Sequence, residues 1–394
     1  MDQRIHWRGY EMRVFFLLAA VVFGMMDICS GAYTMEYTGK RTKLFHNGRP
    51  VSFLSCAGEQ MRRYPESEIR DLVKLAWQSA WGAAHGVADR ERAWKYFSRE
   101  FSAAVPDDLP LFEVISPDYC RVNLGAWKKA GLPGKWLFNM FCASAEILPE
   151  SEKIFNGYID QLGQLLGERR GELDEFMKKY RGGAVHHSAS YRKRYRPSYR
   201  LVNIRFITAF PVLMAAATLP EKAVRVISVD GRAASGKTTL AGQLAVILEA
   251  ETVHMDDFFL PAELRTPGRL SEAGGNVHYE RFKKEVLPYL AEAQKFTYQK
   301  FDCSKMQPGE MRHIAASRWR IVEGAYSMHP EFGDYADLKV FFDISPAEQT
   351  ARIRKRNGER MAAVFAERWI PMEEKYITAY DIKKRADIIL GSDN

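Results

Sequence analysis

The stretch Gly231-Arg-Ala-Ala-Ser-Gly-Lys-Thr238 matches the pattern G-x-x-x-x-G-K-[ST] at every fixed position. The residues before it, Ala223–Val229, are rich in β-branched side chains and predict a short strand. The residues after it, Thr239–Leu248, predict a helix with an apolar face. A strand, a glycine-rich loop and a helix in this order are typical of a loop that binds phosphate groups.

The residue types of this loop indicate how it would hold a nucleotide. Gly231 and Gly236 allow backbone conformations that a Cβ atom would block, so the N–H groups can point inward toward phosphate oxygens. Lys237 is predicted to reach the β- and γ-phosphates, and the Thr238 hydroxyl to hold Mg²⁺. We therefore expect ATP and Mg²⁺ here, with contacts from Gly231, Arg232, Ala233, Ala234, Ser235, Gly236, Lys237, Thr238 and Thr239.

Around this loop, the chain from 221 to 394 alternates between predicted strands and predicted helices. Such alternation is typical of an α/β fold, here a P-loop fold whose parallel sheet is covered by helices on both faces. Right-handed crossovers would bring the carboxyl ends of the strands to one edge, where ligands bind. Strands are expected at 224–229, 252–255, 296–301, 318–322, 337–343 and 387–390, and helices at 237–249, 277–293, 345–356 and 361–380.

Acidic residues follow two of the predicted strands. Asp256 and Asp257 end one of them, and a carboxylate there could accept the proton of a hydroxyl that attacks the γ-phosphate. Asp256 is the candidate base and Asp257 a candidate contact to the acceptor, although two acids could also form a solvated turn or a helix cap. Glu323 ends another strand and is a candidate to organise Mg²⁺, or else a structural acid.

Arginines are concentrated near the end of the predicted helix 345–356. Such a group could close over a triphosphate and neutralise the charge of the transition state, with Arg356 and Arg360 as the candidate catalytic members. The alternative is a solvated charged helix, because even-spaced residues do not share one helical face. The group comprises Arg352, Arg354, Arg356 and Arg360.

Residues 224–390 resemble the uridine kinase and phosphoribulokinase-like group of P-loop kinases, which includes the nicotinamide riboside kinases. The resemblance covers somewhat under half of the chain. It implies that Asp256 is the catalytic base and that the arginine group forms a lid. The stretches that carry it are Gly231–Thr238, His254-Met-Asp-Asp-Phe-Phe259, Ile321-Val-Glu-Gly324 and Arg352–Arg360.

The resemblance also implies where the acceptor would bind. Phe301-Asp302 is similar to a Tyr-Asp pair of the acceptor site, with Phe in place of Tyr. His278, followed by Tyr279, stands where such kinases often place an aspartate that holds ribose hydroxyls. An imidazole can form a hydrogen bond with one hydroxyl, but it cannot accept hydrogen bonds from two hydroxyls as a carboxylate does. His278 therefore puts a nucleoside acceptor in doubt, but it does not affect the predicted kinase chemistry.

The first 220 residues differ in composition and pattern from the rest. They hold 31 Lys and Arg against 23 Asp and Glu, so the net charge of +8 belongs to them. Apolar periodicity predicts helices at 67–77, 158–166 and 173–180, and thus a mainly helical domain at 35–220 before a kinase domain at 221–394. This domain has a faint likeness to the extra N-terminal domain of some bacterial uridine-kinase-like proteins.

Three further segments of this half carry open alternatives. Val14–Met26 is an apolar run within 1–34, and these residues form a signal or anchor, a native helix or an artefactual extension. Tyr191, Tyr195 and Tyr199 alternate with basic residues, which suits nucleic acid but is more typical of a packed stripe. A metal site formed by His85, His186 and His187 meets no ligand spacing.

Together these patterns predict a cytoplasmic kinase that transfers the γ-phosphoryl group of ATP to a hydroxyl of a small molecule. A nucleoside is the leading acceptor by resemblance, and a vitamin alcohol, a sugar or a polynucleotide 5′-hydroxyl is the alternative. A nucleotide-dependent switch that grips nucleic acid through the basic half is the rival from another class. We expect no membrane partner, since an ATP site and scattered cysteines favour the cytosol.

Overall fold

The computed structural model describes most of the chain and divides it into two compact units, residues 1–217 and 218–394. The predicted apolar run Val14–Met26 lies outside the described residues, as do 1–32 altogether. No helix in the described part is both long and apolar enough to cross a membrane. The described residues are 33–37, 42–46, 49–87, 89–145, 149–303 and 305–391.

Helices form most of the first unit, as the sequence predicts. The predicted helices at 67–77, 158–166 and 173–180 correspond to α3, α7 and α8. The helices are α2 (Phe53–Arg63), α3 (Ile69–Trp81), α4 (Arg90–Ala103), α5 (Leu124–Lys129), α6 (Gly134–Ala143), α7 (Ser151–Leu166), α8 (Arg170–Lys179), α9 (Ala189–Tyr195) and α10 (Phe210–Thr218). In α3 all five residues expected on the apolar face are buried, namely Ile69, Leu72, Val73, Ala76 and Trp77.

The first unit also contains two antiparallel sheets that the sequence analysis missed. One is formed by β1 (Tyr33–Tyr37), β2 (Thr42–His46) and β3 (Arg49–Pro50). The other is formed by β4 (Phe112–Val114), β5 (Tyr119–Asn123) and β6 (Tyr199–Asn203). Four of the five residues of β5 are buried, so the strand lacks the alternation that identifies a half-buried strand. Pro197 lies between α9 and β6, where its ring would interrupt a continuous helix through the three tyrosines.

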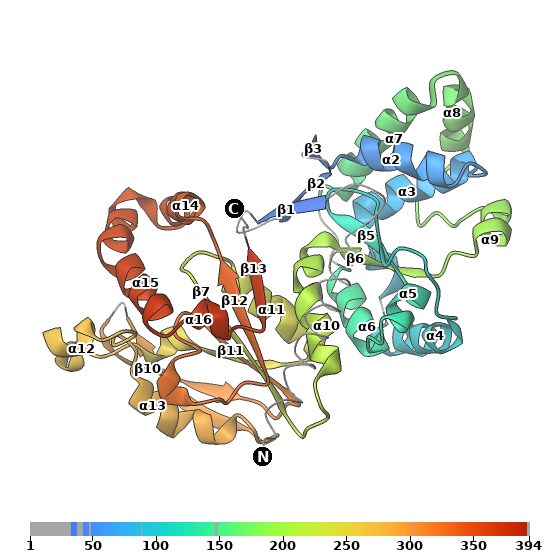
Figure 1. The fold of residues 1–394 in the computed structure, drawn as a ribbon. Coiled ribbons are helices and arrows are strands. Elements are labelled where there is room, and N and C mark those ends of the chain that lie inside the picture. Colours follow the sequence, from blue (N-terminus) through green and yellow to red (C-terminus); the bar gives the residue numbers. More distant parts are fainter. Residues whose placement is uncertain are drawn as a thin grey trace, which may run out of the picture. The chain divides into compact units, whose positions relative to one another are not determined.

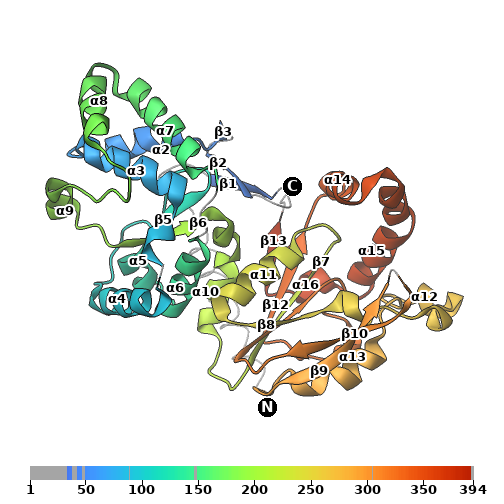
Figure 2. The same ribbon diagram turned by 180° about the vertical axis from the view of Figure 1, so that it is seen from behind.

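The second unit is built on a five-stranded parallel sheet, which confirms the predicted α/β fold. The strand order is β13-β12-β7-β11-β8, so β7 is central. The strands are β7 (Arg225–Gly231), β8 (Glu251–His254), β11 (Trp319–Glu323), β12 (Leu338–Asp343) and β13 (Ile388–Gly391). Helix α11 (Lys237–Leu248) contacts the sheet on one face and α16 (Ile382–Arg385) on the other, as Figure 1 and Figure 2 show from opposite sides.

Two predictions for this unit need correction. The strand expected at 296–301 is not part of the parallel sheet, because β9 (Phe296–Asp302) pairs antiparallel with β10 (Gln307–Ile314) in a separate hairpin. The helix expected at 277–293 ends early, since α13 spans only Tyr279–Glu285. Val286 then leaves helical geometry, and a short 3-10 turn containing Pro288 follows.

The other helices follow the predicted ranges more closely. Helix α12 (Pro267–Ser271) is short, and α14 (Pro346–Val364) is followed by a π-turn and by α15 (Ile370–Ala379). Gly358 interrupts α14 with a φ of 80°, which places a break where the sequence predicted a turn between two helices.

Parallel pairing brings three strand ends to one edge of the sheet. Glu323 at the end of β11 is in register with Val229 of β7 and with His254 of β8. Strand β7 runs into the loop 231–236, and β8 runs into the 3-10 turn Met255–Phe258. The glycine-rich loop and the predicted acids are therefore neighbours at this edge.

Candidate active site

The glycine-rich loop lies so close to β12 that its first glycine cannot be replaced. Gly231 has a φ of +140°, and a Cβ atom built there would lie 2.1 Å from the carbonyl oxygen of Phe342. Gly236 has a φ of +118°, and Ala234 also adopts a positive φ of 60°. Residues with alternating backbone conformations of this kind direct consecutive N–H groups into a concave anion site.

Side chains from α14 and α15 hold the outside of this loop. The Ala233 N–H donates to Glu373 Oε2 at 2.8 Å, and Gln349 Nε2 donates to the Ala233 carbonyl at 3.2 Å. Arg352, from the predicted lid group, donates to the carbonyl oxygen of Ser235 at 2.9 Å. Burial raises the pKa of Glu373 to about 7, although the nearby Lys237 opposes this shift. The sequence analysis assigned no role to Glu373, which has the pattern of an ordinary helical glutamate.

The inner groups of the loop fit a polyphosphate. The Lys237 ammonium is buried and donates to the carbonyl oxygens of Gly231 at 2.8 Å and Arg232 at 2.7 Å. The Ser235 hydroxyl is buried and has no hydrogen-bond partner among the described residues. Buried donors of this kind are costly to leave without a partner, so an anion in the loop would satisfy them. The side chain of Arg232, in contrast, points to ion pairs with Asp343 and Glu374.

Thr238 and Glu323, the two residues predicted to organise Mg²⁺, are joined by a hydrogen bond. The Thr238 hydroxyl donates to Glu323 Oε1 at 2.8 Å, and His254 Nδ1 lies 2.8 Å from Glu323 Oε2. Burial opposes ionisation of Glu323, but the hydrogen bonds from His254 and Thr238 outweigh it and lower its pKa. The bond to Glu323 raises the pKa of His254, which the sequence analysis did not assign to the site.

These two oxygen ligands suit Mg²⁺, which binds proteins through one or two such groups and takes its remaining ligands from phosphates and water. No group of three or more His, Cys, Asp or Glu side chains in the described part of the chain could hold a metal ion alone.

A cavity of about 510 Å³ opens beside the loop and is lined by all four acids predicted for the site. Asp256 is an exposed residue in the lining of this cavity, yet the protein atoms around its carboxylate reduce its solvation and thereby raise its pKa. The buried Asp257 accepts a hydrogen bond from the Tyr298 hydroxyl at 2.8 Å. The cavity is lined by Thr238, His254, Asp256, Asp257, Phe259, Lys300, Phe301, Asp302, Cys303, Arg312 and Glu323.

Four of the predicted site residues belong neither to the glycine-rich loop nor to the lining of this cavity. His278 caps α13, and its Nδ1 lies 3.0 Å from Glu280 Oε2. The Tyr279 ring lies 3.6 Å from the guanidinium carbon of Arg269. Arg356 and Arg360 are exposed beside the break in α14, so Arg352 is the member of the predicted lid group that contacts the loop.

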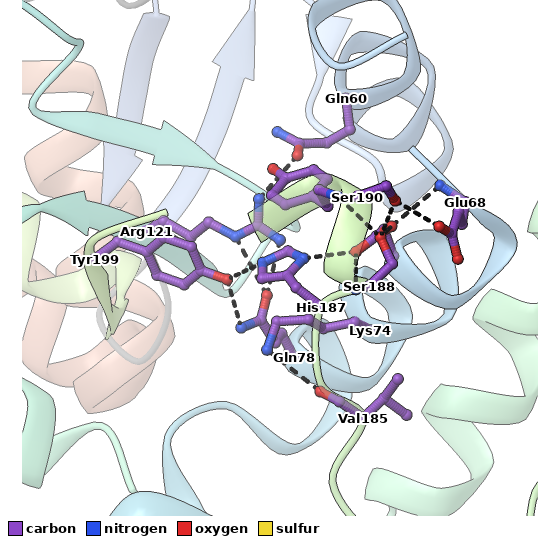
Figure 3. A network of polar contacts seen from close by, with 12 residues as sticks. Gln60, Glu68, Lys74, Gln78, Arg121, Val185, His187, Ser188, Ser190 and Tyr199 are labelled. Atoms are coloured by element: carbon purple, nitrogen blue, oxygen red, sulfur yellow. Dashed lines mark hydrogen bonds and ion pairs between the residues drawn. The ribbon is translucent and has the colours of Figure 1, made fainter. Parts of the chain in front are cut away.

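A second polar cluster lies in the first unit, around Asp71 of α3; Figure 3 labels His187, Ser188 and Tyr199 among its members. Asp71 accepts hydrogen bonds from the N–H and the hydroxyl of Ser188, and His187 Nδ1 lies 2.8 Å from its Oδ1. His187 Nε2 lies 2.7 Å from the hydroxyl of Tyr199, which also accepts a bond from Gln78. We name this cluster the α3 network; it comprises Gln60, Glu68, Asp71, Gln78, Glu113, Arg121, His187, Ser188, Ser190 and Tyr199.

The α3 network accounts for one predicted histidine and for the tyrosine stripe. His187 is engaged by Asp71 and Tyr199, whereas His186 is exposed and the His85 side chain lies outside what the structure describes. Tyr191 stacks on His187 with ring centroids 4.1 Å apart. The tyrosines thus pack against protein, which is the more typical role of such a stripe.

Comparisons with known proteins give a likeness in fold for about half of the chain. No protein-family model and no curated protein matches it. Similar solved structures include a candidate uridine kinase from Bacillus stearothermophilus, with 20% identity over 47% of this chain and 97% of that one, at a TM-score of 0.38. A candidate fructose transport system kinase from a Silicibacter species has 22% identity over 47% and 98%, also at 0.38. The function proposed next therefore depends on this chain's own residues.

Proposed function

We propose that the chain is an ATP-dependent phosphotransferase with a small-molecule alcohol as its acceptor. The observation that supports this most is that one cavity holds both Asp256 and the Thr238–Glu323 pair, directly beside the glycine-rich loop. A base for a hydroxyl and the ligands for a phosphate-bound Mg²⁺ are the two parts that phosphoryl transfer needs at close range.

In this proposal each residue has a separate task. Asp256 takes the proton of the acceptor hydroxyl while the hydroxyl oxygen forms a bond to the γ-phosphorus. At the same time the bond between the γ-phosphorus and the oxygen that bridges it to the β-phosphate breaks, which releases ADP. Lys237 leaves its two loop carbonyls and pairs with the β- and γ-phosphates. Bound Mg²⁺, held by Thr238 and Glu323, would neutralise the phosphate charge.

The raised pKa of Asp256 suits the role of a base. A carboxylate with a raised pKa is a stronger base, so the transfer of the hydroxyl proton to it costs less free energy than transfer to an ordinary aspartate. Its neighbours, chiefly the Glu323 carboxylate, add to the effect of burial, whereas Lys237 opposes it.

A nucleoside is the acceptor that the resemblance suggests, with Asp257 and Asp302 in the cavity as its contacts. His278 and Tyr279 would join them only if the segment that carries them moved toward the cavity. A vitamin alcohol, a sugar and a polynucleotide 5′-hydroxyl are the alternatives. An enzyme that consumes ATP belongs in the cytoplasm, which is our proposed location.

The test is a panel of nucleosides, sugars and vitamin alcohols incubated with the full chain, ATP and Mg²⁺, and scored by ADP release. We expect at least one acceptor to raise ADP release well above the rate without acceptor, and EDTA to abolish it. ADP release that no alcohol stimulates would contradict the proposal.

A nucleic-acid-dependent ATPase is the second candidate, favoured by the exposed basic residues of α9. Arg192, Lys193, Arg194 and Arg196 are all exposed, although Arg194 pairs with Glu66 at 3.0 Å. ATPase activity would then rise with added polynucleotide, and the stimulation would fall steeply between low and high salt. Activity that is indifferent to polynucleotide at both salt concentrations would exclude this candidate.

A further inference from the structure

We propose that the acceptor carries an anionic group, a carboxylate or a phosphate, in addition to the hydroxyl that is phosphorylated, and that Arg312 and Lys300 bind it. This inference rests on the proposed kinase function and narrows its acceptor to a chemical class. It concerns the side of the cavity formed by the β9–β10 hairpin, of which only the first strand was expected from the sequence, and in the main sheet.

The hairpin presents one face to the predicted acids. Side chains two residues apart on a strand share a face, so Tyr298, Lys300 and Asp302 of β9 belong together. Arg312 of β10 is paired with Tyr298 across the hairpin and lies on the same face. The Tyr298 hydroxyl bonds Asp257, which shows that this face is directed at the turn that also carries Asp256.

Most acids of the cavity have partners within the protein, whereas Lys300 forms no ion pair with a described residue and Arg312 forms only two long ones, with Asp257 and Glu310. Glu323 is held by Thr238 and His254, and Asp257 by Tyr298. Asp302 lies near Lys305, with an N–O distance of 3.9 Å. The carboxylates of the cavity are thus engaged by protein groups, except Asp256, which has the proposed role of base. Their presence therefore does not by itself exclude an anionic acceptor.

Arg312 is the group whose hydrogen bonding is incomplete. Its Nε is buried and has no hydrogen-bond partner among the described residues. The nearest carboxylate oxygens are 3.7 Å away on Asp257 and 3.6 Å away on Glu310, both beyond hydrogen-bond distance. A buried Nε–H without a partner is costly, whereas the side chain as a whole is 40% exposed, so a planar carboxylate or a phosphate in the cavity could accept a pair of hydrogen bonds from the guanidinium.

Lys300 provides a second positive charge in the same cavity. It lines the cavity and forms no ion pair with another described residue. Lys300 and Arg312 therefore give this side of the cavity two positively charged groups that an anionic acceptor could contact. The absence of His278 from the cavity lining points the same way, since the resemblance assigns that position to ribose hydroxyls.

The experiment compares acceptors in matched pairs that differ by one anionic group. Glycerol against glycerate and uridine against 6-carboxyuridine test a carboxylate, and fructose against fructose 1-phosphate tests a phosphate. We expect the anionic member of at least one pair to have a kcat/KM about 10-fold or more above that of its neutral partner. If the neutral member is equal or better in every pair, the inference is wrong while the kinase function stands.

Two variants then test the assigned residues. Arg312→Gln and Lys300→Gln should each raise the KM for the anionic acceptor about 10-fold or more, with kcat and the KM for ATP nearly unchanged. Arg312→Lys should recover part of the loss, and Lys284→Gln, at an exposed lysine on α13, is the matched control.

The possible failures are distinguishable. An unchanged KM for the anionic acceptor in both Gln variants would overturn the assignment of these residues. If no acceptor of either kind is phosphorylated although the chain binds ATP, the kinase function and the inference fail together.

Discussion

The cavity of the second unit and the α3 network of the first unit each contain a histidine–carboxylate pair, but the pKa of the histidine is raised in one and lowered in the other. His254 and Glu323 lie 2.8 Å apart in the cavity, and His187 and Asp71 lie 2.8 Å apart in the network. The bond to Glu323 raises the pKa of His254, whereas burial lowers the pKa of His187 to about 4. At equal distances, the pKa values of the two histidines are thus shifted in opposite directions.

Exposure and neighbouring charge explain the difference. The His254 side chain is 38% exposed and near the carboxylates of Asp256 and Asp257, which favour its cationic form. The His187 side chain is 7% exposed and near the cations Arg121 and Lys74, which oppose it. A histidine–carboxylate pair is therefore no indication of chemistry by itself, and the cavity with its incompletely bonded donors is what separates the candidate site from a structural network.

The largest effect is expected where the cavity meets the loop. Lys237→Ala should abolish phosphoryl transfer, because the charge that pairs with the β- and γ-phosphates is lost. The measurement is ADP release with saturating acceptor. Urea unfolding of the variant is the control for folding, and turnover near the native rate would remove the loop lysine from the mechanism.

Asp256 separates proton transfer from nucleotide binding. Asp256→Asn should lower kcat by about 10²-fold or more, the usual contribution of a general base, while the affinity for ATP stays close to that of the native chain. Asp257→Asn, one residue away, should act mainly on acceptor binding and stability, because its carboxylate bonds Tyr298. A native kcat in Asp256→Asn would show that another group takes the proton.

The α3 network should respond in stability and not in chemistry. Asp71→Asn replaces a carboxylate by a neutral amide and so weakens the hydrogen bonds from Ser188 and the contact with His187. It should therefore lower the free energy of unfolding of the first unit by about 2–4 kcal/mol. Urea denaturation measures this, with exposed Asp174→Asn as the matched control. If Asp71→Asn instead lowered kcat per folded molecule and left the free energy of unfolding unchanged, the α3 network would have a role in catalysis and not in stability.

Glu373 predicts a smaller effect that depends on pH. Its folded pKa of about 7 exceeds the usual glutamate value of 4.5, so between these values the folded chain binds more protons than the unfolded chain. Its contribution to stability is complete below about pH 4.5 and is lost as the pH rises through 7. Glu373→Gln should remove that decline and make the chain about 1–3 kcal/mol more stable than native at pH 8.

The measurement for Glu373 is urea unfolding at pH 5 and pH 8. Glu367→Gln, at an exposed position between α14 and α15, is the matched control. If the free energy of unfolding depended on pH in the same way in Glu373→Gln and in the native chain, Glu373 would not take up a proton in the folded state as proposed.

The sequence predicted those parts of the site that depend on local spacing. The loop 231–238 and the acids Asp256 and Glu323 follow strands of the parallel sheet, and parallel strands bring such residues to one edge. The structure joins Thr238 and Glu323, the two residues predicted to organise Mg²⁺, by a hydrogen bond.

Residues that act through distant pairing could not be predicted in this way. Arg312 reaches the cavity because β10 pairs with β9, and the exposed residues of β10, with Pro308 and Gly309, hide the strand pattern. Glu373 meets Ala233 across 140 positions of the sequence, and Asp71 meets His187 across 116. Helical and strand periodicity relates only residues a few positions apart, so it could not predict these contacts. His278 was assigned to the acceptor site from the resemblance, but it does not line the cavity.

The most direct test of the central claim is a crystal structure of the chain with a non-hydrolysable ATP analogue and Mg²⁺. The account predicts the triphosphate among the backbone amides of 231–238, with Lys237 released from the carbonyls of Gly231 and Arg232 and the terminal phosphate facing Asp256. A nucleotide bound elsewhere, or a terminal phosphate directed away from Asp256, would contradict it.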